Sequence, residues 1–277
     1  MAYAVQGDYA LDYYPCRYGR SKILFRGPRR DLSFPFIAVL GGTETYGKHI
    51  SMPYPALIEE RTGLRMVNLG YPNAGIDLYL GEPEVARILA AARVTVVMIM
   101  GAQNLSNRFY SVHPRRNDRF LKASSLLQTI YREVDFTEFH FTRHMLQTLQ
   151  AVSPAKFAVM ADELRWAWVA RMTALLDQAG GKTVLVWLAD DPPPAPGPAD
   201  LSRDPLLIDR SMLTALRAKA TAYVEVIPSS AALRDSPPEM VPGPFDSLPV
   251  RGLPGPAVHE ELAAALGPVL ERIYEAE

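Results

Sequence analysis

The chain has 277 residues, of which 48% are hydrophobic and 21% are charged, and its formal net charge is −1. Such a chain is long enough to bury a large core, and its near-neutral charge excludes a general attraction to nucleic acid or anionic membranes. A single cysteine, Cys16, excludes an internal disulfide framework and is typical of a reducing compartment. We find no signal-peptide pattern and no apolar run of membrane-spanning length, so we expect a cytoplasmic protein.

Residues 1–33 form an N-terminal arm before the first predicted strand, and they are rich in tyrosine and arginine. Three roles fit this composition: the arm wraps around the fold, binds anions, or makes a contact between subunits. The last role would make the protein a homo-oligomer. No motif within the arm decides between the three.

Five short apolar segments rich in β-branched residues predict buried strands, because they are apolar on both faces. They lie at residues 36–42, 65–70, 94–101, 182–190 and 223–230. Helical patterns of apolar residues lie at 54–63, 82–92, 161–181 and 257–276. Strands that alternate with helices predict a parallel sheet joined by right-handed crossovers, and hence a single α/β domain over residues 34–277.

A long insertion at residues 105–150 follows the third strand, at the edge where ligands of open α/β sheets bind, so we expect it to act as a lid. The insertion begins as a loop and continues as an aromatic-rich helix. This helix would place His140 and His144 four residues apart on one face, a spacing that a metal site can use. Because the pattern offers no matching third ligand, we predict a structural pair and no metal.

The loop after the first strand, "GGTETYGK", admits two interpretations. Residues 42–48 have the spacing of a phosphate-binding loop, with Lys48 in the lysine position, which predicts a nucleotide- or phosphate-binding transferase. That loop needs a helix beginning at the lysine, with Ser or Thr as the next residue. Here His49 follows, two prolines close behind it oppose a helix, and Glu44 would repel phosphate.

The same loop resembles the first block of the SGNH (GDSL-like) hydrolases, a Gly-Asp-Ser-x-Thr-x-Gly loop after the first strand. Gly41, Thr45 and Gly47 are in step with that block, and Thr43 stands in the serine position. The segment "YPALIEERTGLRMVNLGYPNAG" resembles the helix, second strand and second block that follow in this family. The segment "MGAQNLSN" ends the third strand where the family has Gly-x-Asn-Asp.

This resemblance implies a three-layer α/β/α fold with a five-stranded parallel sheet in the flavodoxin-like order 2-1-3-4-5. It also implies acyl transfer, in which a hydroxyl attacks an ester carbonyl, an imidazole takes its proton and an acid orients the imidazole. Carried over by position, Thr43 is the nucleophile, and Asn73 with Gln103 or Asn104 meets the oxyanion. Gln103 stands in place of the family's asparagine, and Asn104 in place of the aspartate beside it.

The last block of the family, Asp-x-x-His before the final helix, supplies the acid and the base. Here Asp246 stands in the acid position, but Pro249 occupies the position of the histidine. The nearest histidine is His259 at the start of the last predicted helix, and we expect it to be either the base or a surface residue of the helix end. His113 on the lid is a second candidate base.

Lid residues after the third strand predict a ligand-binding wall, because arginine side chains suit anions and aromatic rings stack on sugars. The residues concerned are Arg108, Tyr110, His113, Arg115 and Arg116. The alternative is a solvated loop whose arginines pair with Asp118, Glu133 and Asp135.

Two further functions from different classes stand beside the transferase. The first is an ester hydrolase or acyltransferase that acts on a small or carbohydrate-linked acyl ester. The second is a binding protein for an anionic or glycan ligand that kept the pocket and lost the chemistry, which accounts for the substituted blocks. Both predict a small-molecule or glycan ligand, and for neither do we expect a cofactor, a nucleic-acid partner or a membrane.

Overall fold

The computed structural model describes residues 11–234 and 252–276, and its centre is a five-stranded parallel sheet of order β2-β1-β3-β6-β7. The strands are β1 (Ile37–Leu40), β2 (Met66–Asn68), β3 (Val94–Met98), β6 (Lys182–Leu188) and β7 (Ala222–Val226). Each lies within or at the edge of a segment predicted to be a strand. The prediction of a parallel α/β sheet is therefore confirmed.

Both faces of this sheet are buried, which explains why its strands are apolar without alternation. In β1, Ala38 and Leu40 belong to one core cluster, whereas Ile37 and Val39 belong to a second cluster. Successive side chains of a strand point to opposite faces, so one run of four apolar residues contributes to two cores.

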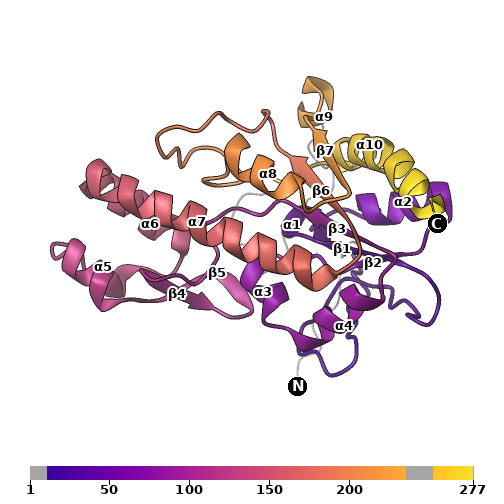
Figure 1. Ribbon diagram of the computed structural model, residues 1–277, viewed down its shortest axis with the longest axis horizontal. Coiled ribbons are helices and arrows are strands. Elements are labelled where there is room, and N and C mark those ends of the chain that lie inside the picture. Colours follow the sequence, from indigo (N-terminus) through magenta and orange to yellow (C-terminus); the bar gives the residue numbers. More distant parts are fainter. Residues whose placement is uncertain (1–10, 235–251, 277) are drawn as a thin grey trace, which may run out of the picture.

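Helices cover each face and produce three layers (Figure 1). The second core lies between the sheet and two helices, α2 (Tyr54–Thr62) and α10 (Pro256–Glu275), which pack against each other. The first core is covered by α3 (Ile76–Leu80), α4 (Pro83–Ala91), α7 (Pro154–Ala179) and α8 (Arg210–Arg217). A short helix, α9 (Ser230–Arg234), follows β7 and contacts α10. Among the described residues, no helix combines the length and apolar character that crossing a bilayer requires.

The long helix α7 begins seven residues before the predicted segment, at Pro154 instead of residue 161. Ser153 caps it by accepting a hydrogen bond from the backbone N–H of Lys156, and proline is favoured at the first helical position. Its C-terminal cap, Gly180, has φ +64°, a left-handed conformation that glycine adopts without strain.

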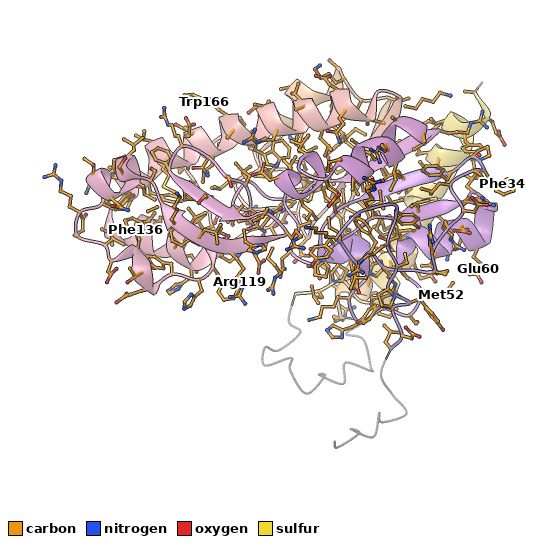
Figure 2. All side chains as sticks on the ribbon, turned by 90° about the horizontal axis from the view of Figure 1, so that it is seen from below. Phe34, Met52, Glu60, Arg119, Phe136 and Trp166 are labelled. Atoms are coloured by element: carbon orange, nitrogen blue, oxygen red, sulfur yellow. The ribbon has the colours of Figure 1, made fainter. Side chains whose placement is uncertain are left out.

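The insertion at 105–150 differs from the predicted loop and helix, because it opens with an antiparallel hairpin. The hairpin consists of β4 (Tyr110–His113) and β5 (Arg116–Ala123), and then come α5 (Ser125–Ile130), the 3₁₀ turn η1 (Phe136–Glu138) and α6 (Thr142–Val152). Phe120 contacts the rings of Phe136 and Phe139 within this lobe, and Figure 2 shows the position of Phe136 in the lobe. Figure 1 shows the lobe extending beyond the left side of the sheet.

The described part of the N-terminal arm, residues 11–33, packs against the domain. A bridge pairs Cys16 with Phe25, and the side chains of Tyr18, Ile23 and Phe25 are buried in the first core cluster. The expectation that the arm wraps around the fold is confirmed for these residues.

Candidate functional site

Thr43 lies at the carboxyl edge of the sheet, three residues after β1, as the first residue of the one-turn helix α1 (Thr43–Tyr46). The chain can turn so sharply here because Gly41 has no side chain. A Cβ atom on Gly41 would lie 2.1 Å from Thr45 Oγ1 and 2.7 Å from Met98 Cβ. Gly47 ends α1 with φ +70°. Both glycines are therefore required by the backbone around Thr43.

Asn73, after β2, is the hydrogen-bond partner of Thr43. Its backbone N–H donates to Thr43 Oγ1 at 3.0 Å, and the Thr43 hydroxyl donates to Asn73 Oδ1 at 3.3 Å. Asn73 has φ +56°, and asparagine is one of the few residues other than glycine that adopts this conformation readily. Asparagine therefore suits the backbone conformation that this position requires.

Asn104, and not Gln103, contacts the Asn73 loop. The Asn104 amide donates to the Asn73 carbonyl oxygen at 3.4 Å and accepts a hydrogen bond from Thr142 Oγ1 of α6 at 2.8 Å. Gln103 folds back over Gly101, where a Cβ atom would lie 2.2 Å from Gln103 Oε1. This Oε1 atom is buried and has no hydrogen-bond partner among the described residues.

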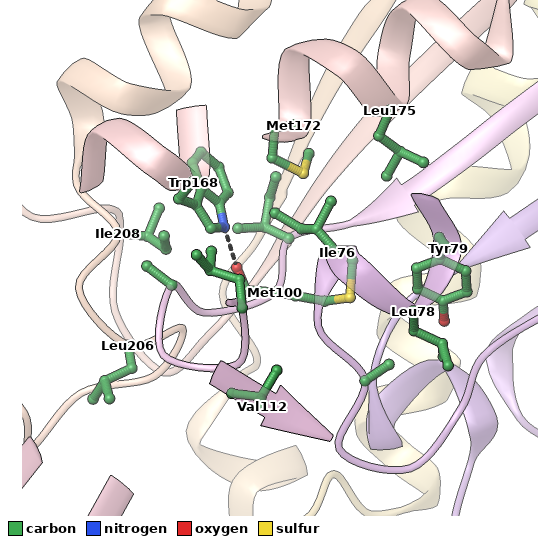
Figure 3. Packing of buried hydrophobic residues seen from close by; sticks show 14 of the residues in the cluster. Ile76, Leu78, Tyr79, Met100, Val112, Trp168, Met172, Leu175, Leu206 and Ile208 are labelled. Atoms are coloured by element: carbon green, nitrogen blue, oxygen red, sulfur yellow. Dashed lines mark hydrogen bonds between the residues drawn. The ribbon is translucent and has the colours of Figure 1, made fainter. Parts of the chain in front are cut away.

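The start of the loop after β3 is fixed from the core by α7. The buried indole of Trp168 donates a hydrogen bond to the carbonyl oxygen of Met100 at 2.7 Å (Figure 3). Figure 3 shows Trp168 packed among apolar side chains, with Met172 and Ile208 nearby. The loop therefore leaves the sheet at a defined position.

The lid hairpin adds Asn117 and Asp118 of β5 to the site. Asn117 is fully buried, and its Oδ1 accepts hydrogen bonds from the backbone N–H groups of Gly75 at 2.8 Å and Leu78 at 3.1 Å. Asp118 Oδ2 accepts a hydrogen bond from the Asn73 side chain at 3.4 Å, while Asp118 Oδ1 is buried without a partner among the described residues. The hairpin thus places the Asp118 carboxylate next to Asn73, the hydrogen-bond partner of Thr43.

Glu44 is a second acid beside Thr43, and the loop after β6 brings a third, Asp204. Burial raises the pKa of the Glu44 carboxyl, and the charge of Asp204 raises it further. The loop with Asp204 is joined to the loop after β3, because the N–H of Ala102 donates to the carbonyl oxygen of Leu206 at 2.9 Å. Arg143 of α6 forms an ion pair with Asp204.

Sequence patterns missed this convergence of acids. The sequence identifies Glu44 only as a charge that opposes phosphate, and Asp118 only as a partner for lid arginines. Both interpretations follow from local sequence. The position of Glu44 just after the first predicted strand, at the carboxyl edge, is a signal that could identify it, whereas Asp118 lies within the long insertion and has no such signal.

His259 is buried, with 1% of its surface exposed, so the alternative of a surface residue is wrong. Its Nδ1 accepts a hydrogen bond from the backbone N–H of Tyr54 at 3.2 Å, and its ring stacks on the Tyr54 ring at 6.1 Å. Burial, together with the positive charge of Arg26, lowers the pKa of His259 to about 4. Its expected acid partner, Asp246, and Pro249 lie outside the described residues.

His113 caps the turn of the lid hairpin. Its Nδ1 accepts hydrogen bonds from the backbone N–H groups of Arg115 and Arg116, each at 3.2 Å. In a neutral imidazole whose Nδ1 accepts, the proton is on Nε2. Neither His113 nor His259 therefore has a lone pair available to take a proton from Thr43.

Most arginines of the predicted binding wall have partners within the protein. Arg108 pairs with Glu163 of α7 at 3.2 Å, and Arg116 pairs with Asp118 at 3.6 Å. Tyr110 is buried and donates to the carbonyl oxygen of Gln103 at 2.7 Å. Arg115 is exposed in the hairpin turn.

Of the three acids expected to pair with lid arginines, only Asp118 does so. Glu133 pairs with Lys156 of α7 at 2.9 Å. Asp135 instead caps η1 by accepting the N–H of Thr137. The solvated-loop alternative is thus correct for Asp118 and wrong for the other two.

Two other predicted arrangements lack the required geometry. No helix begins at Lys48, because α1 ends at Tyr46 and α2 begins at Tyr54. His140 precedes α6, which begins at Thr142, so the prediction that it shares a helical face with His144 is wrong. Within residues 11–234 and 252–276, no cluster of three or more His, Cys, Asp or Glu side chains is arranged to hold a metal.

Comparison with protein families gives a match that covers nearly the whole chain. The family described as "Domain of unknown function (DUF6473)" matches residues 1–274. The chain belongs to this family. A comparison of this DUF6473 protein with curated proteins finds no match. The DUF6473 match includes the N-terminal arm, so the arm and the α/β domain fall within one family unit.

Proposed function

We propose that this DUF6473 protein has an SGNH-like fold and binds a small, neutral, hydroxyl-rich ligand of carbohydrate type at the site around Thr43. The strand order β2-β1-β3-β6-β7 supports the proposed kinship, because among these five strands it is the order 2-1-3-4-5 expected for that fold. Thr43, Asn73 and Asn104 follow successive strands of this sheet, at the positions that the resemblance assigns to an acyl-transfer pocket.

The hydrogen bonding of the two candidate bases carries this proposal. Hydrolysis of the Thr–His type needs an imidazole that accepts the proton of the attacking hydroxyl. The chain has five histidines, and the described hydrogen bonds of the Thr43 hydroxyl run to Asn73 instead of to any of them. His259 and His113 each use Nδ1 to accept backbone N–H groups. A site that lacks an activated nucleophile retains the capacity to bind.

The unused polar atoms favour a ligand that donates hydrogen bonds. Gln103 Oε1 and Asp118 Oδ1 are buried acceptors without partners among the described residues. Three donors around Thr43 already have an acceptor, because the Asn73 backbone N–H, the Asn73 amide and the Asn104 amide each donate one hydrogen bond. The carboxylates of Glu44, Asp118 and Asp204 disfavour an anion. We therefore favour a neutral glycan over the anionic ligand that the lid arginines suggested.

Isothermal titration calorimetry with a panel of neutral sugars and oligosaccharides tests the proposal, with matched uronic acids and sulfated sugars as the anionic set. We expect saturable binding to members of the neutral set, weakened about tenfold or more by Asp118→Asn because a charged acceptor is lost. Asp162→Asn, at an exposed ion pair of α7, is the matched control and leaves binding unchanged. Binding of the anionic set alone would overturn the ligand class.

One observation favours a second function, ester hydrolysis with Glu44 as proton acceptor. Glu44 adjoins Thr43 in the chain, and its raised pKa is the kind of shift found in catalytic carboxylates. The Glu44 carboxylate would take the hydroxyl proton while Thr43 Oγ1 bonds to the acyl carbon, and that proton would leave with the departing alcohol. Glu44 would then take a proton from the water that attacks the acyl-threonine ester, and return of this proton to Thr43 Oγ1 would release the carboxylic acid. Turnover of p-nitrophenyl acetate or acetylated sugars, reduced about a hundredfold or more by Glu44→Gln, would establish this function over simple binding.

A further inference from the structure

The α1–α2 loop, residues 47–53, has backbone carbonyl groups that converge on the guanidinium of Arg26 from the N-terminal arm. Arg26 Nη1 donates to the carbonyl oxygens of Tyr46 at 3.1 Å and Gly47 at 2.5 Å. Its Nη2 donates to those of Ile50 at 2.6 Å and Ser51 at 2.9 Å. One arm residue, 5% exposed, thus holds four carbonyl groups of the segment that follows Thr43.

A buried arginine without an acidic partner is costly unless its donors are satisfied. No carboxylate of the described residues forms an ion pair with Arg26, so the four carbonyl dipoles provide the compensating negative charge. The face of the Tyr13 ring lies 5.1 Å from the guanidinium carbon and adds a cation–π contact. The environment of Arg26 is therefore built for a cation.

The loop needs these donors, because it has little regular structure of its own. The helix α1 has four residues, too few to be stable alone, and the carbonyl groups at its end lack helical partners. Gly47 and His49 both have positive φ, which turns neighbouring carbonyl groups to the same side. A cation at the C-terminus of a helix is also electrostatically favourable.

Tyr13 provides a second connection between the arm and the same loop. The backbone N–H of His49 donates to the Tyr13 hydroxyl at 2.9 Å, and the Tyr13 and Tyr46 rings lie 5.2 Å apart. The Tyr13 carbonyl oxygen accepts the N–H of Gly27 at 3.0 Å, which ties Tyr13 to the residue after Arg26. Two segments of the arm, around Tyr13 and around Arg26, therefore contact the loop, and the hydrogen bond between Tyr13 and Gly27 joins these two segments.

We propose that the N-terminal arm positions the Thr43 loop, with Arg26 acting as a built-in cation in a cage of backbone carbonyl groups. Arg26 is a positioning residue, since it reaches α1 through the carbonyl groups of Tyr46 and Gly47. Its consequence for ligand binding rests on the proposed function, whereas its effect on the loop does not.

Amide hydrogen exchange of residues 43–51, measured on full-length protein, tests the cage directly. We expect Arg26→Ala to raise the exchange rates of the Tyr46, Gly47 and Ile50 amides by about tenfold or more, because local opening no longer breaks four hydrogen bonds. Millimolar guanidinium, well below denaturing concentrations, restores protection, while equal sodium chloride does not. Arg29→Ala, an exposed arginine of the same arm, is the matched control.

The rescue separates a cage from general stabilisation, which free guanidinium would not restore. Arg26→Lys serves if the alanine variant does not fold, and its loop amides are expected to exchange faster than those of wild type, because one ammonium replaces a forked donor. Wild-type exchange in folded Arg26→Ala, or loss of protection spread evenly over the sheet, would overturn the proposal. Guanidinium-dependent protection in a protein that binds no sugar would support the cage and reject the proposed function.

Discussion

Two corners of the carboxyl edge, one around Thr43 and one around His259, differ in what their polar atoms can still do. The Thr43 residue is half-buried and its hydroxyl is hydrogen-bonded to Asn73, which in turn reaches the Asp118 carboxylate, whereas His259 is enclosed and its Nδ1 is occupied. The first corner has the properties of a site, and the second those of a core. A histidine at the start of the last helix can act as a catalytic base only if one of its ring nitrogens has a free lone pair.

Removal of the imidazole should show the largest difference between the corners. We expect His259→Ala to lower the free energy of unfolding by about 3 kcal/mol, because it leaves a cavity and deprives the Tyr54 N–H of its acceptor. Thr43→Val, measured by the same urea titration, should cost less than about 1 kcal/mol. A small effect of His259→Ala on stability, together with loss of an esterase activity, would reverse our assignment.

Acidification should weaken the His259 corner selectively. The folded pKa of about 4 lies below the ordinary value, so the unfolded chain binds the proton more readily. The stabilisation is therefore present above the unfolded pKa and is lost as the pH falls towards 4. Between pH 7 and pH 5 we expect a loss of about 2 kcal/mol from this group. The free energy of unfolding of wild type and of His259→Gln, measured at both pH values, isolates the contribution of His259. An equal pH dependence of stability in the two proteins would refute this prediction.

The smallest expected effect concerns the backbone under the Thr43 corner. We expect Asn73→Ala to cost about 1 kcal/mol more than Asn73→Gly, because both lose the side-chain hydrogen bonds but only alanine is strained at φ +56°. Thermal unfolding of the two variants measures this difference. If alanine and glycine are equally stable, the left-handed conformation is not what selects asparagine here.

The sheet and most helices could be predicted because their signals are local. A strand buried on both faces is apolar and rich in β-branched residues, as in β1 and β3, and this signal can be recognised within a few residues of sequence. The lid hairpin was missed because its signal is interrupted. Its register shifts on either side of Val112, and its turn consists of Pro114 and Arg115, which read as a basic loop.

The site could be predicted only in part, for a spatial reason. Thr43, Asn73 and Asn104 follow successive strands, so the topology alone brings them to one edge. Asp118 and Asp204 arrive on long connections whose path depends on tertiary contacts, such as that between Ala102 and Leu206. Whether an imidazole nitrogen is already used, as in His259, is likewise a property of packing and not of sequence pattern.

Opening of the lid would break the hydrogen bonds that the Asn117 side chain forms with the start of α3. Helix α3 has no side-chain cap from its own first residues, and the amide oxygen of Asn117 accepts the N–H groups of Gly75 and Leu78 in that role. Swinging the hairpin away would uncap α3 and release the segment that carries Asn73. We therefore infer that the hairpin is a fixed wall beside Thr43 and not a flap, and that the ligand we propose would enter past its margin without lifting it.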